Sequence, residues 1–75
     1  MNMAKRYLIT TPTPAVTTGR KAREFIMLPN NSIVDVSLPL DGIRGLIEVT
    51  VDGETMLMFA EDLRLRGRLV FHASA

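Results

Sequence analysis

The strongest structural signal in the sequence is the segment Leu46-Ile47-Glu48-Val49-Thr50-Val51-Asp52-Gly53-Glu54-Thr55-Met56-Leu57-Met58-Phe59. Its two apolar runs flank Asp52-Gly53, a preferred two-residue hairpin loop because both of its residues accept positive φ. A two-residue loop fixes the register, so Val49 is expected to face Met56. The sequence therefore predicts a β-hairpin with one apolar face, made of Ile47, Val49, Val51, Met56 and Met58.

The second run of this hairpin has a rival interpretation as a helix. Residues 54–66 are rich in strong helix formers, and Met56, Phe59 or Ala60, and Leu63 have helical spacing. Gly67 would then be the C-cap. The consistent hairpin register favours a strand that ends at about Phe59. A turn or one short helical turn is expected near residues 60–66.

Other short strands are expected on both sides of the hairpin. Residues 32–38 and 68–72 read as strands, and residues 29–31 and 39–42 as turns. Residues 7–10 read as a short strand or an extended arm. The segment before the first turn is ambiguous, since it fits a short helix over residues 21–24 or a strand over residues 24–28. The fold class predicted is mainly all-β, as a small barrel or sandwich of five to six strands.

The N-terminal third has a different composition. Residues 10–18 are Thr- and Pro-rich, and the prolines impose an extended path that reads as a linker and not as part of a core. The chain is therefore divided into an extended basic arm over residues 1–23 and a small β-barrel domain over residues 24–75.

The order of the expected elements resembles an SH3-like small barrel of the KOW type. The resemblance covers about residues 32–72: the strand 33–36, the turn 41–45, the strand 46–51, the Asp52-Gly53 hairpin, the next strand and the turn at Asp62-Leu63. It implies binding of protein or nucleic acid in place of catalysis, although a fold does not fix a function.

Charge is unevenly distributed along the 75 residues, although the formal net charge is only +1. All eight acidic residues lie between Glu24 and Asp62, where Arg44 is the single base. The basic residues before and after this acidic body are the candidate binding residues for a partner or polyanion: Lys5, Arg6, Arg20, Lys21, Arg23, Arg64, Arg66 and Arg68.

Three interpretations of this charge pattern stay open. The basic arm could fold onto its own body, lie on the acidic body of a neighbouring subunit, or bind an external polyanion. If residues 63–69 form a strand, Arg64, Arg66 and Arg68 line one face and could clamp phosphates or carboxylates. If they form a helix, the three side chains spread around it and no such face exists.

The sequence contains no catalytic or cofactor signature. It has no cysteine, and His72 is its single histidine, so no metal site is predicted. Its serines lie in no nucleophile motif, and we expect no enzyme activity, cofactor or small-molecule substrate. No apolar stretch is long enough to span a membrane, and the lack of disulfides favours a cytoplasmic location, or a virion for a phage-encoded chain.

Composition favours association with another protein. Hydrophobic residues make up 47% of the chain, more than a thin core of this size can bury.

The leading hypothesis is a non-enzymatic interaction or assembly module whose partner is a second copy or a larger complex, for example a structural or accessory protein of a phage particle. The alternative is a KOW-like protein that binds nucleic acid or a transcription complex. With four aromatic residues and no tryptophan, the chain offers few stacking platforms for bases.

Overall fold

A computed structural model describes residues 5–18, 23–37, 40 and 42–70 of the chain. Seven strands and one helix follow one another in the described residues: β1 (Lys5–Ile9), β2 (Thr13–Thr17), β3 (Phe25–Leu28), β4 (Ile33–Val36), β5 (Leu46–Val51), β6 (Glu54–Phe59), α1 (Ala60–Arg66) and β7 (Gly67–Val70). Among these residues, no helix is long and apolar enough to cross a membrane.

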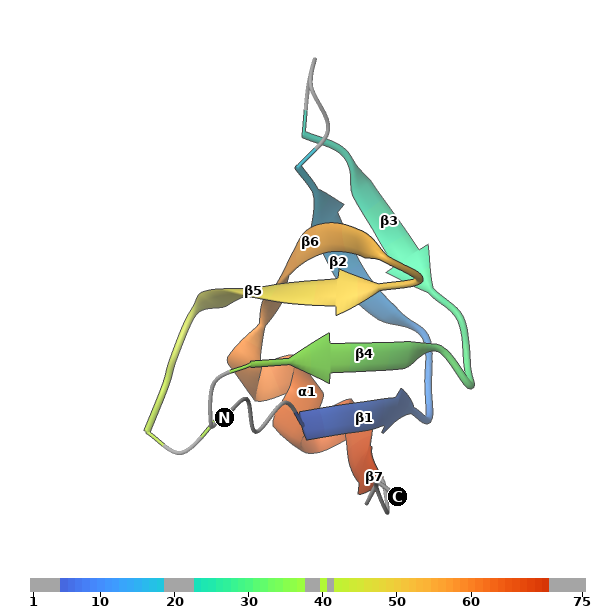
Figure 1. Ribbon diagram of the computed structural model, residues 1–75, viewed down its shortest axis with the longest axis vertical. Helices are drawn as coiled ribbons and strands as arrows, with labels where there is room; N and C mark the ends of the chain where they lie inside the picture. The colour runs from blue at the N-terminus through green and yellow to red at the C-terminus, as the bar shows by residue number, and fades with distance from the viewer. Residues whose placement is uncertain (1–4, 19–22, 38–39, 41, 71–75) are drawn as a thin grey trace.

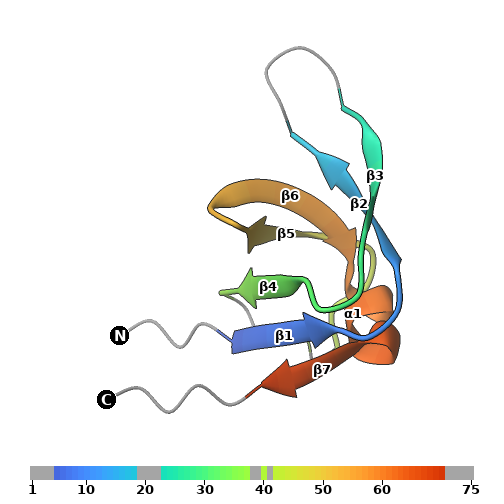
Figure 2. The same cartoon turned by 90° about the vertical axis from the view of Figure 1, so that its right-hand side faces the viewer.

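The strands form one antiparallel sheet in the order β3-β2-β6-β5-β4-β1-β7. The sheet curls into a half-barrel, and the β2–β3 pair extends beyond the other strands (Figure 1). Figure 2 shows α1 at one end of the curl, close to β1 and β7. The prediction of a mainly β fold is confirmed, with seven strands in place of five or six, and the curled sheet is consistent with a small β-barrel.

The β5–β6 hairpin has the predicted register. Val49 pairs with Met56, and Ile47 pairs with Met58. The loop residues Asp52 and Gly53 have φ angles of 52° and 80°, as a type I′ turn requires. All five residues of the predicted apolar face are buried: Ile47, Val49, Val51, Met56 and Met58.

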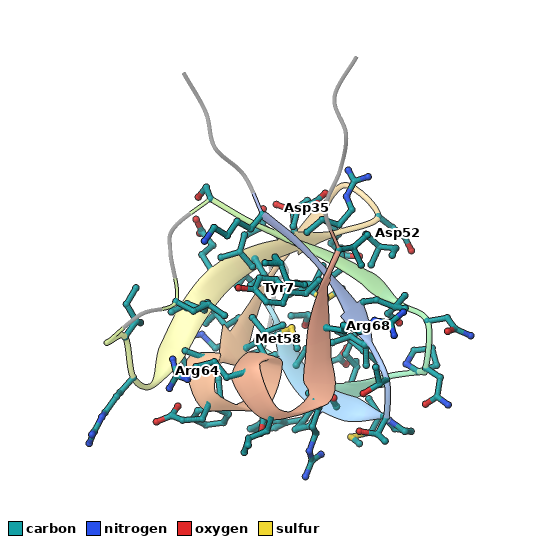
Figure 3. The ribbon with its side chains drawn as sticks, turned by 90° about the horizontal axis from the view of Figure 1, so that it is seen from below. Tyr7, Asp35, Asp52, Met58, Arg64 and Arg68 are labelled. Atoms are coloured by element: carbon teal, nitrogen blue, oxygen red, sulfur yellow. The ribbon has the colours of Figure 1, made fainter. Side chains whose placement is uncertain are left out.

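The core lies on the inner face of the curl. Successive residues of a strand point to opposite faces, and in β4, β5 and β6 the buried residues occupy alternate positions. Tyr7 and Met58, labelled in Figure 3, lie inside the curl. From α1, Ala60 and Leu63 are fully buried against this core. The helix therefore closes one end of the half-barrel.

The predicted change from strand to helix occurs at Phe59. Residues 54–59 form β6 and residues 60–66 form α1. Acidic side chains stand in the first turn of α1 and basic side chains in its last turn, which suits the helix dipole. Gly67 ends the helix by donating its N–H to the Leu63 carbonyl. A Cβ at Gly67 would lie 2.7 Å from the Leu63 oxygen, so the corner between α1 and β7 requires glycine.

The prediction that residues 10–18 form a linker outside the core is wrong. β1 pairs with β4 and β7, and β2 pairs with β3 and β6, so residues 5–9 and 13–17 belong to the sheet. Thr13 and Ala15 are buried. The predicted arm is therefore part of the domain over residues 5–18, while residues 1–4 and 19–22 lie outside the described part of the chain.

Proline does not prevent β2 from joining the sheet, because of where it falls in the ladder. Thr17 donates its N–H to the Glu24 carbonyl, so hydrogen-bonded pairs between β2 and β3 recur at every second residue from there. Pro14 faces Met27 in one of the pairs that are not hydrogen-bonded. The ladder to β3 therefore needs no N–H from this residue.

The two other strand predictions near the ends of the sheet are confirmed where they can be checked. β3 (Phe25–Leu28) agrees with the strand alternative for residues 24–28, and β7 covers residues 67–70 of the predicted closing strand. Residues 21–22, which the helix alternative included, and residues 71–72, including His72, lie outside the described residues.

Candidate interaction surface

Three of the basic side chains that the sequence singled out contact the chain's own oxygen atoms: Arg6, Arg64 and Arg66. Arg6 Nε lies 2.8 Å from Asp35 Oδ1, across the β1–β4 ladder. This hydrogen bond, together with the charge of the carboxylate, raises the pKa of Arg6. Arg6 thus fits the interpretation in which the N-terminal bases contact the acidic body of the same molecule.

Two arginines of α1 donate to backbone carbonyls. Arg64 Nη1 lies 2.8 Å from the Leu40 oxygen and 2.9 Å from the Ile43 oxygen. Arg66 Nη1 lies 3.3 Å from the Pro12 oxygen. Both guanidinium groups therefore connect α1 to neighbouring segments of the chain.

Of the two alternatives for residues 63–69, the structure has the helix up to Arg66, so the three arginines do not form a row on one strand face. Arg64 and Arg66 belong to α1 and Arg68 belongs to β7, so the alternation of a strand does not extend over them. Figure 3 shows Arg64 and Arg68 on different sides of the molecule. The acidic first turn and the buried Ala60 and Leu63 make residues 60–66 helical, and this disperses the three side chains.

The remaining candidate bases do not complete a common surface. Lys5 lies on β1 and Arg23 two residues before the start of β3, and both are exposed. Arg20 and Lys21 lie outside the described residues. A binding role for these residues stays a prediction.

A group of apolar side chains lies on the outer face of the other half of the sheet. Phe25 and Met27 of β3 are 78% and 59% exposed, and Phe59 of β6 is 42% exposed. The register joins them across strands, since Phe25 faces Val16, and Val16 faces Leu57. We call this surface the apolar half of the outer face; it consists of Pro14, Val16, Phe25, Met27, Leu46, Leu57 and Phe59.

Polar residues border the apolar half on two sides. Glu48 faces Leu57 at the β5 side, and Thr55 precedes Leu57 by two residues on β6. Leu46 faces Phe59 and continues the apolar surface onto β5. Contiguous apolar surface with a polar border is typical of a protein-binding site.

The other half of the outer face is mixed in character. We call it the charged half; it lies on β4, β1 and β7 and consists of Arg6, Leu8, Ile33, Asp35, Arg68 and Val70. Arg6 faces Asp35 on one side and Val70 on the other, and Leu8 lies between Ile33 and Arg68. Its central charges are paired with each other.

A shallow hollow lies between the two halves. Its volume is about 170 Å³, and it is lined by residues 35–37 of β4 and its following loop and residues 48–50 of β5. Asp35 with Thr50 is the register pair that joins β4 and β5. The hollow is smaller than the roughly 300–1,000 Å³ of ordinary ligand pockets. Among the described residues, no three His, Cys, Asp or Glu side chains gather as a metal site would require.

Sequence reasoning overlooked the apolar half, although its own hairpin contained the signal. A register that buries Met56 and Met58 turns Leu57 and Phe59 to the opposite face, together with Leu46 of β5. Glu48 and Thr50 drew attention to the polar part of that face. The contribution of β2 and β3 could not be recognised while residues 10–18 were taken for a linker.

Comparison with known proteins gives no relative from which a function could be transferred: no family model, no curated protein and no solved structure matches the chain.

Proposed function

We propose that the chain is a non-enzymatic protein–protein interaction module and that the apolar half of the outer face is its binding surface. The observation that carries the proposal is the exposure of Phe25, Met27 and Phe59 together on one side of the sheet. Burying apolar surface yields about 25 cal/mol per Å², and aromatic residues and methionine are enriched at interfaces. A protein partner would remove these side chains from water.

The proposal includes a role in assembly, as a structural or accessory protein of a phage particle or a larger complex. It also includes an SH3-like relationship of the KOW type. The succession of β4, β5, β6 and the short α1 supports it, as does the tight hairpin at Asp52 and Gly53. Small barrels of that type bind their partners without catalysis.

Nucleic-acid binding is the alternative function. It would use the exposed Lys5, Arg23 and Arg68. Lys5 and Arg68 lie on the neighbouring strands β1 and β7, whereas Arg23 precedes β3 at the opposite edge of the sheet. Arg6, Arg64 and Arg66 already donate to the chain's own oxygens. Affinity for a polyanion requires several cations that can reach phosphates together, so the apolar half supports a protein partner better.

Photo-crosslinking in the cells that express the chain tests the proposal. A photoreactive phenylalanine derivative replaces Phe59 in the apolar half or, as a control, Ile33 in the charged half. The two positions are matched, since Phe59 is 42% and Ile33 is 38% exposed. We expect protein adducts of defined mass from position 59 and few from position 33. Equal protein adducts from both positions, or adducts only with nucleic acid, would contradict the proposal.

A further inference from the structure

The outer edge of β3 carries unused main-chain groups. Among the described strands, β3 has β2 as its only neighbour. Thr17 donates its main-chain N–H to the Glu24 carbonyl. Because hydrogen-bonded pairs alternate along an antiparallel ladder, Ile26 and Leu28 also point their N–H and C=O groups toward β2. Phe25 and Met27 therefore direct their N–H and C=O groups away from the sheet.

The same two residues carry the most exposed apolar side chains of the strands, at 78% for Phe25 and 59% for Met27. The strand contains no charge and no proline between Phe25 and Leu28. Charged residues, prolines and bulges are the usual means by which a sheet edge avoids pairing with another chain. β3 has none of these between its ends, and its pair with β2 projects from the body of the molecule (Figure 2).

We infer that β3 pairs with β3 of a second copy, antiparallel and about a two-fold axis that passes beside Ile26. This inference goes beyond the proposed function, because the pairing uses the main-chain edge of β3 and leaves the outer face of the apolar half free for another partner. In this register Phe25 exchanges both main-chain hydrogen bonds with Met27 of the second copy, and the axis repeats the exchange. The side chains of Phe25 and Met27 then lie next to each other on the outer face.

Neighbouring residues favour this register over its neighbours. A shift toward the N-terminal side places the Glu24 carboxylate beside Ile26 of the second copy. A shift in the other direction sets Phe25 against Pro29, which has no N–H to donate. The register centred on Ile26 pairs Phe25 with Met27 and Ile26 with Ile26, so its three central pairs are apolar. Glu24 lies opposite Leu28 only at the ends of the paired segment. The apolar halves of both copies then form one continuous surface.

The opposite edge of the sheet does not offer the same site. β7 is the other edge strand, and its ladder with β1 continues from the bond between Thr10 N–H and the Arg66 carbonyl. By the same alternation Gly67 and Leu69 face outward, but Gly67 already donates its N–H to Leu63 within the α1 corner. β7 thus retains one residue with both groups available, beside the charged Arg68.

Cysteine crosslinking of the full chain tests the inference, because the sequence contains no cysteine of its own. In the proposed register Ile26 faces Ile26 of the second copy in a pair that is not hydrogen-bonded, with Cα atoms about 4.5 Å apart. That separation suits a disulfide. Under mild oxidation, I26C is expected to form covalent dimers at least about tenfold faster than L65C, although Leu65 of α1 is 82% exposed.

A second variant tests the main-chain pairing directly and does not depend on the cysteine variant folding. Met27→Pro removes an N–H that the β2–β3 ladder does not use, so the monomer should keep its fold. Sedimentation of the wild-type chain should show a dimer fraction that increases with protein concentration. M27P should reduce the association constant at least about tenfold. Circular dichroism checks that M27P remains folded.

Equal crosslinking rates for I26C and L65C, or a folded M27P chain that associates like the wild type, would overturn the inference. The proposed function fails separately. If photo-crosslinking at position 59 captures a different protein while I26C forms no dimer, the apolar half is a binding surface and the β3 edge does not pair with a second copy.

Discussion

The apolar half and the charged half of the outer face are built on one sheet, yet their side chains meet solvent in opposite ways. In the charged half, Arg6 and Asp35 face each other across β1 and β4 at 2.8 Å. In the apolar half, Phe25 and Val16 face each other across β3 and β2, and Phe25 remains 78% exposed. The first arrangement is complete within one molecule, whereas the second leaves apolar area that a partner could cover.

The edges of the two halves differ in the same sense. β7 ends the charged half and is held at its start by the α1 corner, where Gly67 donates to Leu63. β3 ends the apolar half and has β2 as its only neighbour among the described strands. At β3, unpaired main-chain groups therefore coincide with exposed apolar side chains, which indicates a binding edge.

The largest expected effect is a loss of stability on truncating a side chain of the inner face, compared with truncating one of the outer face. Met58 is fully buried, and its neighbour Leu57 belongs to the apolar half. Met58→Ala should lower the free energy of unfolding by about 2–5 kcal/mol, because it removes buried volume from a thin core. Leu57→Ala should cost clearly less. Urea denaturation of both variants measures this, and equal losses would show that the outer face is as important for stability as the core.

A somewhat smaller loss of stability is expected at the corner between α1 and β7, at the end of the charged half. Gly67→Ala brings a Cβ to 2.7 Å from the Leu63 carbonyl oxygen, so the backbone must shift. The free energy of unfolding should fall by about 1–3 kcal/mol, a typical cost of overpacking. Gly42→Ala is the comparison, since a Cβ there meets no atom within 4 Å, although Gly42 has a φ of 75°. A stable G67A chain would mean that α1 and β7 are not tightly joined.

The ion pair of the charged half should contribute less to stability than the Met58 side chain or the Gly67 corner. Arg6 and Asp35 have side chains that are 40% and 38% exposed, and solvent screens such a pair. A double-mutant cycle with Arg6→Gln and Asp35→Asn should give a small favourable coupling that declines as salt is added. Coupling that persists in high salt would indicate that the charged half excludes water more than its exposure suggests.

The smallest effect is expected at the start of α1. The Glu61 carboxylate accepts hydrogen bonds from its own backbone N–H and from that of Gly45, and these lower the pKa of Glu61 below its ordinary 4.5. A lowered pKa in the folded state stabilises the fold above pH 4.5, and the contribution is lost as the pH falls through the folded-state pKa. Glu61→Gln should flatten the acid limb of the stability profile slightly. An unchanged profile would show that the contact does not persist in solution.

Local signals were sufficient to predict the centre of the fold. Asp52-Gly53 determines both the turn and the register, because few other residues accept positive φ at both loop positions. The register in turn identifies the buried side of β5 and β6. β2 escaped prediction because the proline signal is ambiguous. Pro14 reads as a linker residue unless one knows that its ladder position toward Met27 requires no N–H.

The candidate site depended on long-range pairing that local patterns do not contain. The apolar half brings Val16 and Phe25, from the consecutive strands β2 and β3, together with Leu57 of β6, which is distant in the sequence. The basic residues were easy to find in the sequence, but their surroundings were not. Arg64 reaches the Leu40 carbonyl because α1 packs beside that segment, and the helix that places it there was only an alternative.

Amide hydrogen exchange at several protein concentrations tests the central claim, that association begins at the β3 edge of the apolar half. In dilute solution the amides of Phe25 and Met27 should exchange fast, and those of Ile26 and Leu28, which face β2, should be protected. As the protein concentration rises, Phe25 and Met27 should become protected while Leu69 of β7 should not. Protection of Leu69 first, or fast exchange of Phe25 and Met27 in a sample shown to be dimeric, would contradict it.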